Sequence, residues 1–490
     1  MVAGWNLRDL VRRGIREHAA FLLVACAAAV LYATVASLQW YNMDEGAYLN
    51  AASTVARGGV PFVTFAAREP VLIYYLAAGV GLFGPHLFVA RLQIVLADLF
   101  TGAAVYLLGK ELGGKKVGLA AAGLFFFNPF DVYTFTTVLL EPLAALPLAW
   151  AAYFLLRKKT PDTFRIPLVV GLLLGIAELT RRDAILLTPL LAGALLVRVS
   201  PSTFSARTKA FVFLLVGFAL PLGLVLGYFT SATSVTWMWN QYGLGSAYVD
   251  HTVPLNYHLS VFYYLWVYEP VLIIPASLVP AGALAARGKQ DLAFVALLMS
   301  ALLLGFVLYT GPPNFDWGQG EYEFAATGAM LAVQVVLWMA GALDLEFSES
   351  PGPKVSTLAL VFLGGWAVFY LGFYTFVYPE FLSNYFTDVS VPLSLLAGWW
   401  WADRALRPLA RAVEAPPPAA RPKDRAWVEG VGALLITTVL VGSALFSAVE
   451  VLGPSNPYNQ PTAFDLPQYN LIQRTYSPQT VSQVAVRSHP

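Results

Sequence analysis

The sequence predicts an all-α protein that crosses a membrane many times, and three observations support this class. Hydrophobic residues make up 58% of the 490-residue chain, and charged residues only 12%. A typical soluble protein has roughly 25% charged residues, so this chain has too few to cover a water-facing surface of its size. The mean hydropathy is +0.63. The apolar runs are about twenty residues long, as membrane helices are, and they lack strand-type alternation.

The first apolar run, Ala19–Gln39, follows a basic N-terminus. It is too long for a signal-peptide core and lacks a convincing cleavage site, so we interpret it as an uncleaved first span. The basic residues before it place the N-terminus in the cytoplasm by the positive-inside rule. The loop 41–85 is then outside the membrane. The basic residues concerned are Arg8, Arg12, Arg13 and Arg16.

The segment Val71–Gly84 is apolar but short. At 1.5 Å per residue it covers roughly 21 Å, less than a hydrocarbon core of ~30 Å. We expect a helix that lies at the outer surface or re-enters the membrane. The next run, Leu87–Leu108, then spans inward and brings Lys110, Lys115 and Lys116 to the cytoplasmic side.

The segment Pro167–Val197 is too long for one straight span, at ~46 Å. Basic residues flank it at both ends, and the sequence TRRD (Thr180–Asp183) interrupts it. Two short spans that meet at the outer face fit these charges. This arrangement predicts Arg181 and Arg182 near the same surface as Asp44.

The whole chain is expected to have about thirteen spans and a catalytic domain over residues 1–410. A Pro-rich cytoplasmic linker (411–427), a last span (428–452) and an outer polar tail (453–490) follow. The remaining predicted spans are Val117–Phe130, Thr136–Leu156, 210–230, 259–286, 290–310, 323–343, 355–377 and 387–403.

The outer loop holds the first candidate site residues. Asp44 and Glu45 are adjacent acids at the start of a candidate surface helix, Gly46–Arg57. The alternative is an ordinary solvated loop. Further along the loop, Arg68 is a candidate phosphate ligand or a headgroup anchor.

Other charged residues each have a functional and a structural interpretation. Glu178 lies four residues before Arg182, so the two are spaced for a helical ion pair that leaves Arg181 for a phosphate. Glu141 faces a cavity or simply opens a helix. Asp98, near the middle of a span, is interpreted as structural, because an unpaired acid there is costly. Asp131 is interpreted as a turn residue.

Composition excludes several other classes. The formal net charge of +1 gives no overall positive field that would suggest nucleic acid, and one cysteine, Cys26, cannot form a disulfide within the chain. The spacing of Asp250, His251 and His258 matches no standard metal-ligand pattern, so no metal or cofactor is expected. The aromatic residues over 237–266 suit a membrane interface or stacking on a sugar.

The order of these motifs resembles the GT-C superfamily of polyprenyl-phosphate-dependent glycosyltransferases. The match covers roughly Ala19–Val197: a span, an Asp-Glu loop, a basic-Pro element, a Tyr-rich short helix, an Asn-Pro hairpin tip and an acid that opens the next span. Protein O-mannosyltransferases and lipid A aminoarabinose transferases are the most similar in pattern. TRRDAILLTP resembles a family segment in which a lysine is common at Arg181. Asn384–Gly398 resembles another, with Asn384 in place of the usual arginine.

The resemblance implies a GT-C fold and an inverting transfer of a sugar from a polyprenyl or dolichyl phosphate to an acceptor hydroxyl at the outer face of the cell membrane. Asp44 would be the base, and Glu45 would orient it or contact the acceptor. The donor phosphate would meet cations, and the acceptor would be a protein, a lipid or a glycan. The phosphate-binding residues would be Arg68, Arg181 and Arg182, and the cavity residues Tyr48, Glu69, Tyr74, Glu141, Asn384 and Tyr385.

A secondary transporter or lipid flippase is the main alternative, and a membrane scaffold a third. A transporter typically shows repeats with broken or charged helices at matching mid-membrane positions. The sequence shows no internal repeat, and its polar residues gather in the outer loops, which favours chemistry at the membrane surface.

Overall fold

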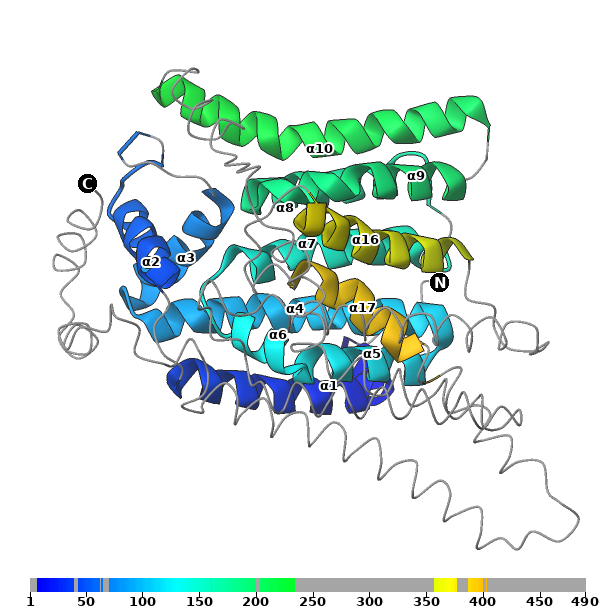
Figure 1. Ribbon diagram of the computed structural model, residues 1–490, viewed down its shortest axis with the longest axis horizontal. Coiled ribbons are helices and arrows are strands. Elements are labelled where there is room, and N and C mark those ends of the chain that lie inside the picture. Colours follow the sequence, from blue (N-terminus) through cyan, green and yellow to red (C-terminus); the bar gives the residue numbers. More distant parts are fainter. Residues whose placement is uncertain are drawn as a thin grey trace, which may run out of the picture.

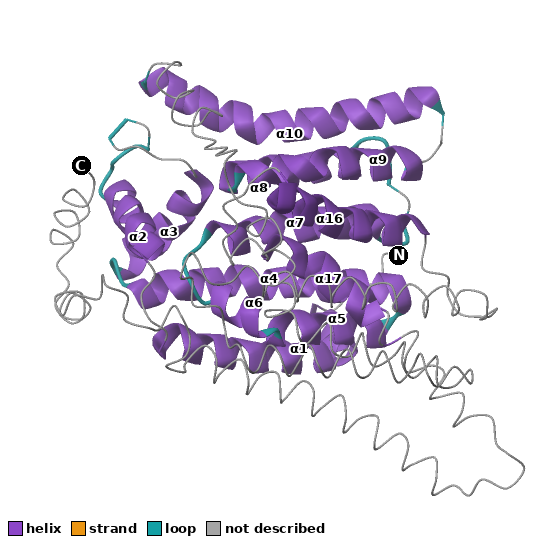
Figure 2. Ribbon diagram, viewed as in Figure 1, coloured by secondary structure: helices purple, strands orange, loops and turns teal. Residues whose placement is uncertain are grey.

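The computed structural model describes residues 7–38, 43–61, 63–64, 70–159, 161–199, 203–233, 357–376, 387–399 and 402. Every element of regular structure in these ranges is a helix (Figure 2). The predicted all-α class is therefore confirmed for the described part of the chain. The predicted number of spans includes segments outside it.

Several predictions concern residues outside the described ranges, and they stay predictions. They are Arg68, Glu69, Asn384 and Tyr385, the residues 237–266, the spans 259–286, 290–310, 323–343 and 428–450, the linker 411–427 and the tail 453–490.

The longer helices run roughly side by side, and two short helices, α2 and α3, lie at one end of this bundle (Figure 1). We call this the site end. The bounds are α1 Leu7–Leu38, α2 Met43–Ala56, α3 Pro70–Phe83, α4 Leu87–Gly113, α5 Lys115–Phe127, α6 Pro129–Thr134, α7 Leu140–Leu156, α8 Arg165–Thr180, the 3₁₀ helix η1 Arg182–Leu187, α9 Thr188–Arg198, α10 Phe204–Ala232, α16 Thr357–Phe376 and α17 Thr387–Trp399.

Three of the described helices are long and apolar enough to cross a membrane: Arg16–Leu38, Leu87–Gly113 and Phe204–Ala232. The last of these, α10, exposes apolar side chains such as Leu224 along most of its length. Because exposed apolar surface of this extent suits lipid rather than water, the chain is a multi-pass membrane protein.

The helical hairpin predicted within Pro167–Val197 is present. α8 ends at Thr180, and α9 begins at Thr188 after a single 3₁₀ stretch. At the far end of α9, Arg198 donates hydrogen bonds to the backbone carbonyls of Leu155 and Arg157 (both 2.7 Å), at the end of α7 and just before α8 begins. The start of α8 and the end of α9 therefore lie at the same end of the bundle.

The predicted span Val117–Phe130 differs from the structure at its end. α5 stops at Phe127, Asn128 is extended (φ −66°, ψ 125°), and Pro129 starts the short α6. A proline disfavours helical backbone at the residue before it, which explains the break. α7 likewise begins at Leu140 rather than Thr136, since Leu139 before it is extended (φ −126°, ψ 166°).

Small residues let several helices approach closely. A Cβ added at Gly109 of α4 would lie 2.9 Å from the Cα of Gly118 on α5. Near the other end of α5, the Tyr32 hydroxyl of α1 donates to the carbonyl of Phe126 (3.0 Å). These contacts join α1, α4 and α5 into one core.

Candidate active site

α2 carries Asp44 and Glu45 in its first turn, inside the helix rather than before it. The predicted surface helix Gly46–Arg57 is therefore present but begins three residues earlier. Consecutive helical residues point about 100° apart, so the two acids have different surroundings. The side chain of Asp44 is exposed, whereas Glu45 is completely buried.

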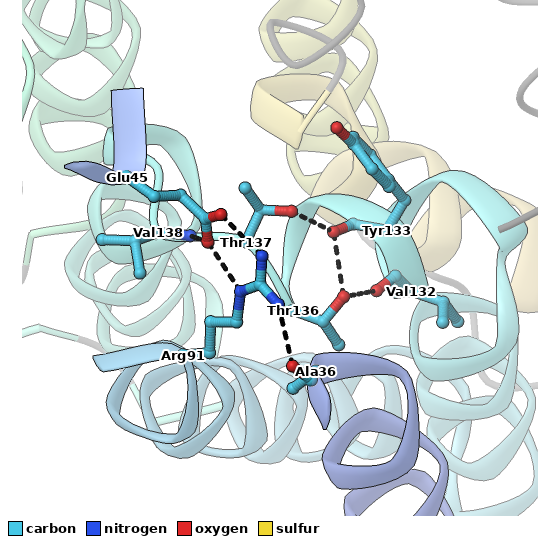
Figure 3. A network of polar contacts seen from close by, with 8 residues as sticks. All are labelled: Ala36, Glu45, Arg91, Val132, Tyr133, Thr136, Thr137 and Val138. Carbon is cyan, nitrogen blue, oxygen red and sulfur yellow. Dashed lines mark hydrogen bonds and ion pairs between the residues drawn. The ribbon is translucent and has the colours of Figure 1, made fainter. Parts of the chain in front are cut away.

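Glu45 forms an ion pair with Arg91 of α4 (Figure 3). The Arg91 Nε donates to Glu45 Oε1 (2.8 Å) and its Nη2 to Oε2 (2.7 Å), a two-point contact. Glu45 Oε1 also accepts the backbone N–H of Val138 (2.9 Å), and the Arg91 Nη1 donates to the carbonyl of Ala36 (2.9 Å). One buried pair thus fixes the start of α2 against α1, α4 and the turn before α7.

These contacts bear on the role predicted for Glu45. Both of its carboxylate oxygens are engaged inside the protein, so the side chain is placed to hold α2 and its neighbour Asp44 in position rather than to face an acceptor. Two-point arginine–carboxylate pairs are strong and fix geometry as well as energy.

Asp44 lies in an environment that makes it more basic than a free carboxylate. Loss of surrounding water, together with the negative charge of Glu45, raises the pKa of Asp44 above its usual value. The charge of Asp44 also acts on Glu141, at the start of α7. The two carboxylates therefore belong to the same polar region at the site end.

α3 forms the rim of this region. Tyr75 and Gln93 lock it to α4, since the Tyr75 hydroxyl donates to the carbonyl of Gln93 and the Gln93 amide to the carbonyl of Tyr75 (both 2.7 Å). Of the predicted cavity residues, Tyr74 is exposed on α3. Tyr48 is half-buried against the apolar cluster between α2, α3 and α4.

The TRRD turn brings Arg181 into contact with three carboxylates. Its Nη1 lies 2.7 Å from Asp388 Oδ2 on α17 and 3.4 Å from Glu141 Oε1 on α7. Its Nη2 lies 2.9 Å from Asp183 Oδ2 on η1. The sequence predicts that Arg181 is available for a phosphate, whereas in the structure its two terminal nitrogens, Nη1 and Nη2, contact acids.

Arg182 lies in this turn, and Glu178 precedes it at the end of α8. α8 ends at Thr180, so Glu178 and Arg182 do not lie on one helix as the predicted ion pair requires, although the charge of Arg182 acts on Glu178. Glu178 Oε2 accepts the backbone N–H of Ile185 (3.0 Å), which closes the 3₁₀ stretch. Arg182 is half-buried at the start of η1. Arg181 and Arg182 lie at the site end, as expected.

Asp131 and Asp98 are both completely buried. Asp131 accepts the hydroxyl of Ser390 (2.6 Å) on α17 and the amide of Asn128 (3.2 Å). Asp131 therefore connects the short α6 to α17. The sequence predicts only a turn residue at this position. Burial raises the pKa of Asp131 to about 8, against the opposing effect of these two hydrogen bonds.

Arg91 and Asp388 were not among the residues predicted for the site. Each is a charged residue within or at the start of an apolar helix, where an unpaired charge is costly. That cost was a signal that each needs an oppositely charged partner. The partner itself was not predictable, because Arg181 and Asp388 are 207 residues apart. Within the described residues, no group of three His, Cys, Asp or Glu side chains is arranged to hold a metal ion.

Residues 67–225 match the sequence profile of the family described as dolichyl-phosphate-mannose-protein mannosyltransferase. This match confirms, over these residues, the resemblance to polyprenyl-phosphate-dependent glycosyltransferases stated above. It includes Arg91, Glu141 and Arg181 and begins after Asp44 and Glu45. No curated protein matches the sequence.

Two solved structures are similar to the chain at low identity. One is ArnT from Cupriavidus metallidurans bound to undecaprenyl phosphate, at 16% identity and a TM-score of 0.48, covering 90% of this chain and 74% of that one. The other is the oligosaccharyltransferase AglB from Archaeoglobus fulgidus with an inhibitory peptide and a dolichol phosphate, at 14% identity and a TM-score of 0.40, covering 97% and 60%.

Proposed function

We propose, from the match of residues 67–225 to a mannosyltransferase family, that this chain is a membrane glycosyltransferase that uses a polyprenyl-phosphate sugar donor. The observation that carries the proposal is the placement of Asp44. It is an exposed carboxylate at the start of α2 with a pKa above its usual value, held by the buried Glu45–Arg91 pair, and its charge acts on Glu141.

In this mechanism Asp44 is the general base. It removes the proton of the acceptor hydroxyl, the hydroxyl oxygen forms a bond to the anomeric carbon, and the bond from that carbon to the phosphate oxygen breaks with its electron pair. Attack opposite the leaving group inverts the configuration. The phosphate is already a good leaving group, so the second carboxylate of a glycoside hydrolase is not required as an acid.

The departing phosphate needs positive charge, and the cations near the TRRD turn and the outer loop supply it. Arg182, half-buried at the start of η1, is the described residue to which we assign this task. Arg68 is the second candidate. Tyr48, Tyr74 and Glu141 belong to the substrate region, as do Glu69, Asn384 and Tyr385 by prediction from the sequence.

The basic N-terminus favours an orientation with the N-terminus in the cytoplasm and the site end outside the cell membrane. The acceptor would then be an outer hydroxyl on a protein, a lipid or a glycan. The proposed reaction does not involve a nucleic acid.

The first test is transfer by the purified chain in detergent. A radiolabelled mannosyl polyprenyl phosphate serves as donor, and solubilised membranes serve as acceptor. We expect Asp44→Asn to lower kcat by about 10²-fold or more, the usual contribution of a general base. Asp162→Asn, an exposed acid that caps the start of α8, is the matched control and should retain full transfer.

Full transfer by Asp44→Asn would remove Asp44 as the base. Counterflow of a substrate into liposomes without any transfer would instead support the transporter or flippase and contradict the enzyme.

A further inference from the structure

Arg181 joins three segments of the chain that are distant in sequence. Its guanidinium lies against Asp388 at the start of α17, Glu141 at the start of α7 and Asp183 on η1. The shortest of these contacts, 2.7 Å, is to Asp388. No prediction from the sequence included Asp388 in the site.

The charges of this cluster argue against a phosphate ligand at Arg181. One guanidinium faces three carboxylates, and the side chains of Arg181, Glu141 and Asp388 are each less than a tenth exposed. Among the residues that the structure describes, three carboxylates lie against one guanidinium, so a phosphate brought to the same place would add negative charge beside these acids. In a buried site of low dielectric this repulsion is not screened as it is in water. The contacts of Arg181 are thus those of an internal ion pair.

The cluster also holds the turn that carries Arg182. The Tyr370 hydroxyl of α16 donates to the backbone carbonyl of Asp183 (3.2 Å), and Glu178 accepts the N–H of Ile185. With Asp388, these contacts attach α16 and α17 to the TRRD turn. The positions of Arg182 and Glu141 therefore depend on the ion pair between Asp388 of α17 and Arg181.

We propose that Asp388 is a positioning residue of the site, which acts through Arg181. Their ion pair fixes the TRRD turn and the start of α7, so that Arg182 rather than Arg181 meets the donor phosphate and Glu141 keeps its place. This inference rests on the proposed function. It assigns the phosphate contact to Arg182 and the positioning contact to Arg181.

The test compares Asp388→Asn and Arg181→Lys in the transfer assay, with kcat and the donor KM measured separately for radiolabelled mannosyl polyprenyl phosphate. Rates are normalised to the folded fraction from size-exclusion chromatography. We expect Asp388→Asn to lower kcat by about tenfold or more and to change the donor KM by less than about threefold. The reason is that small displacements of reacting groups lower the rate of the chemical step more than they weaken substrate binding. Arg181→Lys keeps the positive charge but loses the second terminal nitrogen that contacts the acids. It should likewise lower kcat with little change in the donor KM. Arg207→Lys and Asp162→Asn, both exposed, are the matched controls.

A direct phosphate contact by Arg181 gives the opposite pattern. Removing the Asp388 charge would then release Arg181, and kcat and the donor KM would stay unchanged or the KM would fall, while Arg181→Lys would raise the donor KM. That result overturns the proposal. If Asp388→Asn does not fold, Arg181→Lys decides by the same split. Absence of transfer by the wild-type chain would overturn the proposed function and the positioning role with it, whereas wild-type transfer with an unchanged kcat in Asp388→Asn would overturn the positioning role alone.

Discussion

Asp44 and Glu45 are neighbours in sequence with opposite surroundings. One is exposed and more basic than usual, and the other is buried in a two-point pair with Arg91. At the scale of single residues, the pKa of Asp44 depends on its own loss of surrounding water and on the charge of its buried neighbour Glu45. A buried ion pair is weak evidence of stability, but loss of one partner leaves an uncompensated charge in the interior.

The first prediction follows from that asymmetry. Arg91→Met should destabilise the protein by about 3–5 kcal/mol, because the Glu45 charge would remain buried without its partner. Arg91→Met combined with Glu45→Gln should recover part of the loss. The measurement is the thermal unfolding midpoint in detergent, with the exposed Arg207→Met as control. Equal unfolding midpoints for Arg91→Met and Arg207→Met would contradict this account of the pair.

A second prediction concerns Asp131, whose pKa is raised to about 8 by burial. The folded state binds a proton that the unfolded state, with a carboxyl pKa of about 3.9, releases. Stability from this group is therefore complete below about pH 4 and is lost as the pH rises towards 8. Asp131→Asn, which keeps an acceptor for Ser390, should flatten the dependence of the unfolding midpoint on pH between these values. A slope identical to that of the wild type would show that Asp131 is ionised in the fold.

At the scale of helices, close backbone approach decides which pairs pack. A Cβ at Gly171 of α8 would lie 2.1 Å from the carbonyl oxygen of Leu214 on α10, and one at Gly217 would lie 2.3 Å from the carbonyl oxygen of Leu168. Small residues at such crossings are typical of membrane helices, because neighbouring lipid is as apolar as the helices themselves.

The third prediction is that Gly171→Leu separates α8 from α10. Overpacking of this kind costs typically about 1–3 kcal/mol and should lower the unfolding midpoint in detergent. Gly223 on the same α10 has nothing within 4 Å of an added Cβ, so Gly223→Leu is the matched control and should leave the midpoint unchanged. Similar losses in both variants would indicate that helix propensity, and not the crossing, is responsible.

The helices show what a sequence can and cannot predict here. The short α3 and the break at TRRD followed from the lengths of the apolar runs and the placement of Arg165 and Arg198. The partners of Glu45 and Arg181 did not, because hydrophobic patterns predict which segments are helices but not which side chains meet across them. Arg91 lies 46 residues from Glu45, and no local spacing connects the two.

At the scale of the whole molecule, the orientation in the membrane is the open prediction. With the site end outside, a cysteine placed at exposed Arg57, after α2, should react with a membrane-impermeant maleimide in intact cells. A cysteine at exposed Lys116, at the start of α5, should react only after the membrane is opened. Both are made in a Cys26→Ala background, which removes the chain's only thiol. Labelling of the position at 116 in intact cells would reverse the orientation.

The direction of the helices explains how the site end holds so many acids. Three helices, α2, α7 and α17, begin there, and each carries an acid in its first turn: Asp44 with Glu45, Glu141 and Asp388. A helix start has the electrostatic effect of about half a positive charge, from backbone N–H groups that remain unpaired. The backbone thus supplies positive potential that no side-chain substitution removes and no pH change titrates. It stabilises the acids at these helix starts, and under the proposed function a variant that lacks Arg182 would keep part of the attraction for the donor phosphate.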